Sequence, residues 1–155
     1  KKLVSESNIK IEHLSAGSVS DDEFDKLKKS LYACSDLALA TSGTVVLELA
    51  KASVPMIVGY RTGFLTEIIY RSFVRISSAN LVNLITKSNH IPEFLFGRCN
   101  SKNFYTQAKL LLDNKSQSEA QLISSKQAIR ELGYGSIDPS TRAAKSIKKF
   151  LKLHL

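Results

Sequence analysis

Apolar and polar residues alternate with two different periods along the chain, and this pattern predicts strands and helices in turn. Short apolar runs bounded by polar residues are typical of strands buried in a sheet. The predicted strands cover residues 9–14, 37–41 and 55–60. Apolar residues at helical spacing predict helices over 21–34 and 44–52, between these strands. This order indicates an α/β fold, a Rossmann-like parallel sheet with flanking helices.

Beyond residue 61 the pattern becomes mostly helical. The predicted elements are a helix over 64–74, a short extended piece over 81–85, and helices over 101–113, 116–132 and 139–153. Gly133 and Gly135 lie between the last two helices, where glycine readily ends a helix. A chain of 155 residues has room for one domain, so we predict a single domain over 1–155.

The helix predicted over 21–34 carries its own start signal. Ser20 and Glu23 have the spacing of a capping box, and the acidic residues around them favour the positive end of the helix dipole. Apolar residues recur at helical spacing up to Cys34, which we therefore predict to be buried. Cys34 and Cys99 lie far apart and lack the spacing of metal ligands, so both are predicted to be reduced thiols.

The segment most informative about function is 37–61, with the sequence LALATSGTVVLELAKASVPMIVGYR. An apolar strand leads through Ser42, Gly43 and Thr44 into a helix. The first N–H groups of a helix lack partners and its dipole is positive there, so this turn suits a phosphate anion. Gly43 has no side chain to keep a ligand away from the backbone. The alternative is that Ser42 and Thr44 only cap the helix.

Glu48 lies four residues after Thr44, about one helical turn further on. Its carboxylate can accept hydrogen bonds from the hydroxyls of a ribose bound at the same end of the sheet. A phosphate site beside a ribose acceptor predicts a nucleotide site. The alternative is a surface ion pair between Glu48 and Lys51.

This segment and the blocks that follow it resemble one known family. The run ATSGTVVLELAKASVPMIVGYR is followed by FLTEIIYRSFVRI, NLVNLI and IPEFL. In order and spacing these blocks, within residues 35–95, are similar to the donor-binding C-terminal domain of lipid-A-disaccharide synthase, an inverting glycosyltransferase of the two-domain GT-B architecture. Members of the family join UDP-2,3-diacylglucosamine to 2,3-diacylglucosamine 1-phosphate, giving lipid A disaccharide and UDP.

The resemblance implies roles for a small set of residues: at the UDP diphosphate Ser42, Gly43 and Thr44, at the ribose Glu48, and between the two domains Arg61 and Asn83. Arg61 also follows a predicted strand, at the end where open α/β sheets bind ligands, and its guanidinium suits phosphate oxygens. An arginine after a strand is otherwise a surface residue. Asn83, between apolar residues, otherwise satisfies local backbone groups.

The chain departs from the family in a few places. Val82 stands where the family usually has proline, Lys87-Ser88 where it has a glycine-arginine pair, and Phe96 where it has glutamine. In the family these positions lie in the loop nearest the acceptor, so the differences bear on acceptor binding more than on donor binding. The N-terminal acceptor domain, expected to supply the general base, is also absent from these 155 residues. We therefore expect no catalytic residue in this chain and no transfer by the chain alone.

Twenty-two basic residues against 14 acidic ones give the chain a net charge of +8. The last predicted helix has an apolar face and a basic face, as would a terminal helix that packs on its domain with the basic face in solvent. The positive charge would attract the chain to an anionic bilayer, and this attraction would bring it to a lipid substrate. No apolar run is long enough to span a membrane. The resemblance implies a cytoplasmic location, peripheral to the inner membrane of a Gram-negative bacterium.

The partners implied by the resemblance are a UDP-sugar donor, a lipid acceptor, the missing N-terminal domain and a second copy in a homodimer; no cofactor, metal or nucleic acid is expected. Two other function classes stay open. Another UDP-sugar transferase or epimerase of the same fold would use the same nucleotide segment. A non-catalytic nucleic-acid-binding domain would explain the pI of about 9.5, although the sequence has no recognised RNA- or DNA-binding motif.

Overall fold

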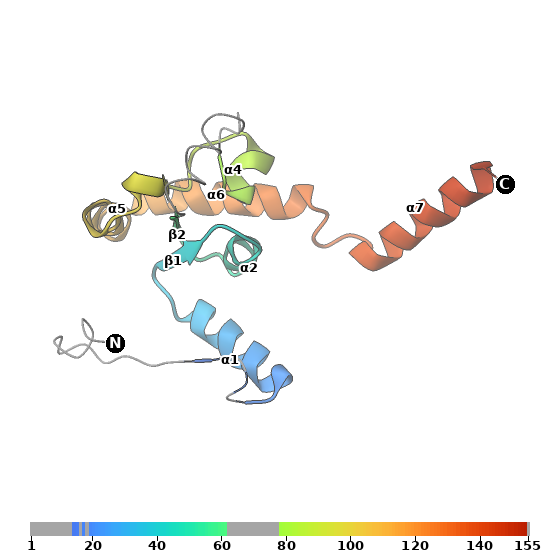
Figure 1. Ribbon diagram of the computed structural model, residues 1–155, viewed down its shortest axis with the longest axis horizontal. Helices are drawn as coiled ribbons and strands as arrows, with labels where there is room; N and C mark the ends of the chain where they lie inside the picture. Colours follow the sequence, from blue (N-terminus) through green and yellow to red (C-terminus); the bar gives the residue numbers. More distant parts are fainter. Residues whose placement is uncertain (1–13, 16, 18, 62–77, 155) are drawn as a thin grey trace. The chain divides into compact units, whose positions relative to one another are not determined.

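The computed structural model describes residues 14, 15, 17, 19–61 and 78–154, with the side chains up to residue 151. The chain divides into two units, Lys1–Cys34 and Ser35–Leu155. Figure 1 shows their elements in sequence colours, and each unit is described by itself. The strand predicted over 9–14 lies outside the described residues except for Leu14, and the helix predicted over 64–74 lies wholly outside them.

The first unit contains helix α1, Asp21–Ala33. Its N-cap is Ser20, whose Oγ accepts a 3.4 Å hydrogen bond from the Glu23 N–H, as the capping-box spacing predicts. The predicted burial of Cys34 is wrong, because Cys34 is exposed and α1 has no buried residue. Cys34 is the C-cap of α1, where the helical repeat that the prediction followed has ended.

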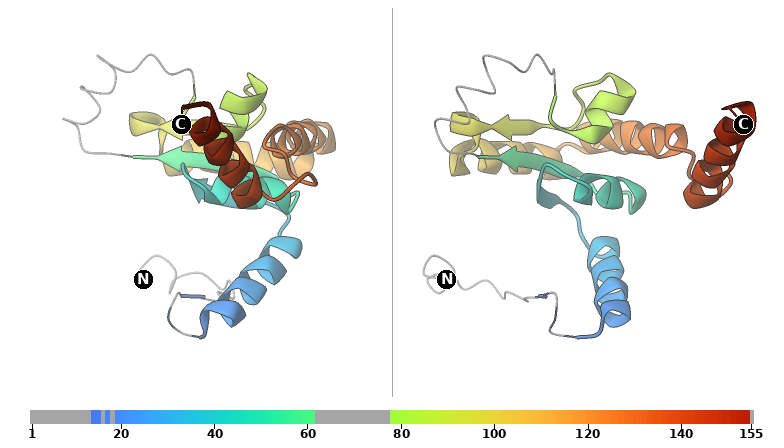
Figure 2. Two further views of the ribbon diagram at one scale, coloured as in Figure 1. Left: turned by 90° about the vertical axis from the view of Figure 1, so that its right-hand side faces the viewer. Right: turned by 45° about the vertical axis from the view of Figure 1, so that its right-hand side comes forward.

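The second unit is built on a parallel sheet of three short strands. These are β1 (Ala38–Thr41), β2 (Met56–Tyr60) and β3 (Glu93–Leu95), in the order β1-β2-β3. Both pairs are parallel, so the predicted fold class is confirmed. Figure 2 shows the arrows of β2 and β3 pointing the same way. The third strand was not predicted, because three residues with one charge carry too little periodicity.

The other elements of the second unit are helices. They are α2 (Val45–Lys51), α4 (Leu81–Thr86), α5 (Ser101–Asp113), α6 (Lys115–Glu131) and α7 (Pro139–His154), with the short 3-10 helix η1 (Phe96–Arg98) after β3. The helices predicted over 44–52, 101–113, 116–132 and 139–153 are thereby confirmed to within two residues at each end.

The extended piece predicted over 81–85 is wrong, because these residues form α4. Asn80 starts the helix: its Oδ1 accepts hydrogen bonds from the N–H groups of Val82 and Asn83, at 2.8 and 3.3 Å. Lys87, with φ of 50°, ends it in the left-handed region. The side-chain cap thus outweighs the extended preference of the branched residues in this stretch.

The core forms where α2, α4 and α6 pack together beside β2. Strand β2 supplies Met56, Ile57 and Val58, each fully buried, as expected for a central parallel strand. Gln121 of α6 brings a polar group into this core, where its Oε1 accepts a 3.0 Å hydrogen bond from the Met56 N–H. This bond satisfies the first N–H group of β2 and attaches α6 to the sheet.

The connection between α6 and α7 is a turn with two glycines. Gly133 and Gly135 have φ of +85° and +84°, values that favour glycine, so the predicted stop signal is confirmed. The guanidinium of Arg142 donates a 2.8 Å hydrogen bond to the Leu132 carbonyl at the end of α6. Residues 139–151 of α7 are all exposed. Within the described part of the chain, no helix is long and apolar enough to cross a membrane.

Gly59 of β2 gives the first testable prediction. A Cβ added there would overlap the ring of Phe104 in α5 and lie 3.1 Å from the Cys99 sulfur. We expect Gly59→Ala to lower the free energy of unfolding by about 1–3 kcal/mol, the usual cost of an overpacked core. Urea unfolding measures the change, with Gly97→Ala as the control, because no atom lies within 4 Å of a Cβ at Gly97. Equal unfolding midpoints for the two variants would contradict the packing described.

Candidate functional site

The candidate site lies where the three parallel strands end. Thr41, Gly59 and Phe94 are aligned in adjacent strands, and the next residues form a second row at the same edge. That row contains Ser42, Tyr60 and Leu95. Parallel α/β sheets bind ligands at this carboxyl edge.

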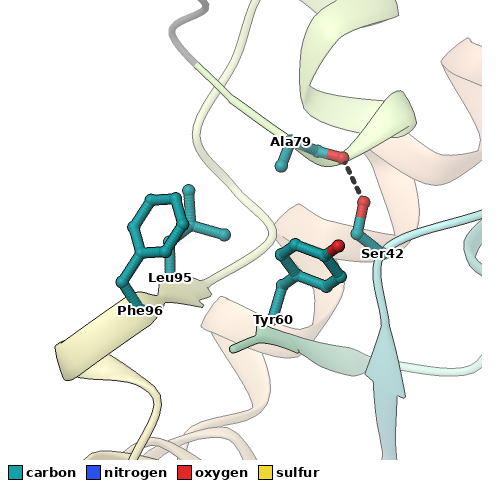
Figure 3. A pocket seen from close by; sticks show the side chains of 5 residues that line it. All are labelled: Ser42, Tyr60, Ala79, Leu95 and Phe96. Atoms are coloured by element: carbon teal, nitrogen blue, oxygen red, sulfur yellow. Dashed lines mark hydrogen bonds between the residues drawn. The ribbon is translucent and has the colours of Figure 1, made fainter. Parts of the chain in front are cut away.

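A pocket of about 270 Å³ occupies this edge. It is lined by Ser42, Tyr60, Ala79, Leu95 and Phe96, which Figure 3 shows around the pocket. Pockets for complete small-molecule ligands usually measure about 300–1,000 Å³. The pocket therefore suits one part of a larger ligand.

Ser42 has a defined partner in this pocket. Its hydroxyl donates a 2.6 Å hydrogen bond to the Ala79 carbonyl, the dashed line in Figure 3. The Ala79 N–H in turn donates a 2.9 Å bond to the carboxylate of Glu93, the first residue of β3. Ala79 is therefore hydrogen-bonded to two residues at the outer strands of the sheet. Ser42 directly follows β1, and Glu93 belongs to β3.

The turn after β1 presents unpartnered donors. Within the part of the chain that the structure describes, the N–H groups of Gly43, Thr44 and Val45 make no hydrogen bond. Gly43 has φ of +150°, a conformation that L side chains rarely adopt, and the space beside its Cα is open. Three adjacent donors beside an open glycine are a physical basis for anion binding. The dipole adds little, because α2 has only seven residues.

The capping role considered for the two hydroxyl residues is not observed. Thr44 is the N-cap of α2 but makes no side-chain cap bond, and Ser42 donates to Ala79 instead.

Glu48 lies one turn into α2, as its spacing predicts. Its N–H donates a 3.3 Å bond to the Thr44 carbonyl, and its side chain is half-buried. The alternative partner Lys51 has its Nζ 4.7 Å from the centroid of the Tyr134 ring. Among the described residues, no ion pair joins Lys51 to Glu48.

The remaining two predicted site residues differ from each other in their surroundings. Arg61 is exposed directly after β2, on the same sheet edge as Ser42. Asn83 is 2% exposed; its Nδ2 donates to the Ile91 carbonyl at 2.8 Å, and its Oδ1 accepts from the Ile91 N–H at 3.1 Å. Asn83 therefore joins α4 to the segment that leads into β3. Its predicted contact with substrate stays a prediction.

Sequence reasoning missed most of the pocket lining. Of the predicted residues only Ser42 lines the pocket, while Tyr60, Ala79, Leu95 and Phe96 were not predicted there. The exposed tyrosine at the end of an otherwise apolar strand was a usable signal for Tyr60. Phe96 was noted only because the family has glutamine at this position. Its φ of 54° is unusual for a bulky residue, and such strain is concentrated at functional sites.

No cluster of three histidine, cysteine, aspartate or glutamate side chains suited to a metal ion occurs among residues 14–61 and 78–151 as far as they are described.

A parallel sheet with flanking helices, a glycine turn after its first strand and a pocket at its carboxyl edge is a Rossmann-like fold, consistent with one half of a GT-B glycosyltransferase. The sequence profile of the lipid-A-disaccharide synthetase family matches residues 2–147, and the chain belongs to that family.

Relatives with the name lipid-A-disaccharide synthase support this assignment. The Rickettsia bellii (strain OSU 85-389) protein is 40% identical over 131 residues, which are 83% of this chain and 34% of the relative. The Rickettsia prowazekii (strain Madrid E) protein is 39% identical over 119 residues, 76% of this chain and 31% of the relative. The Rhodospirillum centenum protein is 37% identical over 123 residues, 79% and 31% of the two chains. The chain thus spans about a third of the length of these relatives.

Proposed function

We propose that this chain is the donor-binding part of a lipid-A-disaccharide synthase. The whole enzyme would join UDP-2,3-diacylglucosamine to 2,3-diacylglucosamine 1-phosphate and release UDP. The observation that carries the proposal is the family match over residues 2–147. It favours this function over another UDP-sugar enzyme and over a nucleic-acid-binding domain.

In the proposed donor site, the diphosphate lies against the N–H groups of residues 43–45. These donors have no partner in the described part of the chain, so a phosphate would gain hydrogen bonds without displacing any within the protein. Ser42 would act through its bond to Ala79, holding the turn in place. The Glu48 carboxylate would accept hydrogen bonds from the ribose, and the exposed Arg61 would offset phosphate charge.

The acceptor hydroxyl and the base that deprotonates it are assigned to residues outside this chain. A base must lie within hydrogen-bond reach of the proton that it takes. The lipid acceptor would meet the donor between this domain and the N-terminal domain, with Asn83 and Arg61 on this side. A lipid acceptor also accounts for a location at the anionic face of the inner membrane, and a homodimer remains part of the proposal.

Titration of the chain with UDP tests the donor site. We expect Gly43→Val to abolish measurable binding, because a branched side chain would block the turn and strain its backbone. Glu48→Ala should weaken binding about 10- to 150-fold, the equivalent of one lost charged hydrogen bond of ~1.5–3 kcal/mol.

Matched controls separate these effects from misfolding. Gly135→Val places the same branched side chain on another glycine with positive φ, +84°, in the connection after α6, and Glu119→Ala removes an exposed glutamate from α6. Both controls should bind UDP like the unchanged chain. If the site variants and the controls had equal affinity, the donor site would have to lie elsewhere.

A further inference from the structure

The side chains that line the pocket at the carboxyl edge of the sheet offer few groups for hydrogen bonding. Ala79, Leu95 and Phe96 carry no polar side-chain atom. The Ser42 hydroxyl donates its proton to the Ala79 carbonyl at 2.6 Å. Tyr60 contributes an aromatic ring beside its hydroxyl. This lining suits an apolar group better than a sugar hydroxyl or the edge of a base, because polar groups lose hydrogen bonds to water when they are buried without partners.

Two aromatic residues contribute most to the apolar character of the pocket. Tyr60 ends β2 and is 44% exposed, so its ring is accessible to a ligand. Phe96 begins η1 and is 7% exposed. In Figure 3 the side chains of Leu95 and Phe96 lie on one side and those of Ser42 and Tyr60 on the other. Since the family usually has glutamine at position 96, this chain presents a phenyl ring in place of an amide.

The order of the proposed donor contacts puts the sugar next to this pocket. Glu48 on α2 is proposed for the ribose, and the turn at residues 43–45 for the diphosphate. Ser42 directly precedes that turn and lines the pocket. The diphosphate of a UDP-sugar joins the ribose to the sugar, so the sugar would lie on the side of the turn away from Glu48. The 2-acyl chain of diacylglucosamine is attached to the carbon next to the one that bears the diphosphate.

We infer that the pocket binds the 2-acyl chain of the donor sugar, with the first methylene groups of that chain between Tyr60 and Phe96. This assignment rests on the proposed function, and it names the group of the donor that the pocket selects. The volume of about 270 Å³ is too small for a complete nucleotide sugar but admits part of a flexible chain. Each methylene group that moves from water into the pocket should raise affinity about fourfold, the equivalent of ~0.8 kcal/mol.

Titration of the chain with three soluble ligands tests the acyl site. The ligands are UDP, UDP-N-acetylglucosamine and its analogue with a 2-N-hexanoyl chain. We expect the hexanoyl analogue to bind roughly tenfold or more tightly than the N-acetyl form, because its additional methylene groups can enter the pocket. Phe96→Asn should reduce this gain to less than about threefold. Asparagine tolerates the φ of 54° at this position, so the change removes the ring without straining the backbone.

Tyr60 supplies a second pair of variants. Tyr60→Ser removes the ring and should lower the gain as Phe96→Asn does, whereas Tyr60→Phe removes only the hydroxyl and should keep the gain. Tyr105→Ser is the matched control, because Tyr105 is 70% exposed on α5 and does not line the pocket. Circular dichroism checks the folding of each variant.

Three results would overturn the assignment. The first is equal affinity of the unchanged chain for the two acyl ligands, although it binds UDP. The second is a gain that persists in both Phe96→Asn and Tyr60→Ser, which would place the acyl chain elsewhere. The third is a gain lost in Tyr60→Phe, which would assign the pocket to a hydrogen-bonded group. Failure of the unchanged chain to bind UDP would contradict the proposed donor site itself, and the acyl assignment with it.

Discussion

The 155-residue polypeptide, assayed alone, is expected to release no UDP from the diacylated donor in the presence of the diacylated monophosphate acceptor. Its proposed site holds only the donor. Placing the acceptor hydroxyl in line with the anomeric carbon can supply ~7–11 kcal/mol of the rate enhancement, and a positioned base supplies more. Without both, the rate should fall by about five to eight orders of magnitude.

The complementary experiment adds the part of a full-length relative that this chain does not cover. We expect the two thirds of a full-length relative that this chain does not cover to restore UDP release if the two pieces dock. Arg61→Ala in the restored pair should lower the rate, while Arg98→Ala, an exposed arginine on η1, should not. Turnover by the isolated chain would refute the proposed division between donor and acceptor parts.

Replacement of Asn83 by alanine should lower the free energy of unfolding by about 2–5 kcal/mol. The change removes two hydrogen bonds and leaves the N–H and carbonyl of Ile91, a residue 1% exposed, without partners. Each buried polar group left unsatisfied costs about 1–3 kcal/mol. Urea unfolding followed by circular dichroism measures the loss.

Asn89→Ala is the control for this prediction, because Asn89 is an exposed asparagine two residues before Ile91. It should change stability by less than about 0.5 kcal/mol. A stable Asn83→Ala variant would show that the Ile91 bonds contribute little. UDP affinity measured on the same variant, under conditions where it is folded, tests separately whether Asn83 also contacts the substrate.

The sequence was sufficient for those parts of the fold that depend on local periodicity. Strands β1 and β2 and helix α2 were predicted within one residue at each end, because apolar runs, a glycine turn and a proline delimit them. Helix α4 was missed because its start depends on one hydrogen-bonded cap at Asn80, while its branched residues favour an extended chain. The burial predicted for Cys34 failed because periodicity predicts which residues share a face, not what covers that face.

The candidate site could be predicted only where consecutive residues form it. The turn at residues 42–44 is such a segment, and Ser42 does line the pocket. Tyr60 and Leu95 reach the same pocket through strand register, and Ala79 reaches it through bonds to Ser42 and Glu93. These relations join residues 14 to 37 positions apart in the sequence, and no local pattern contains them.

The hydrogen bond between Met56 and Gln121 has a consequence for biosynthesis. Its partners are 65 residues apart, and a ribosome that adds ~5–20 residues per second makes them roughly 3–13 s apart. During that interval β2 has been made, but α6, against which α2 and α4 pack, has not. The nascent chain must therefore keep an incomplete core from aggregating, by its own solubility or with a chaperone, until residue 131 is available for folding. Translation of α7 comes later and is not needed for the core to close.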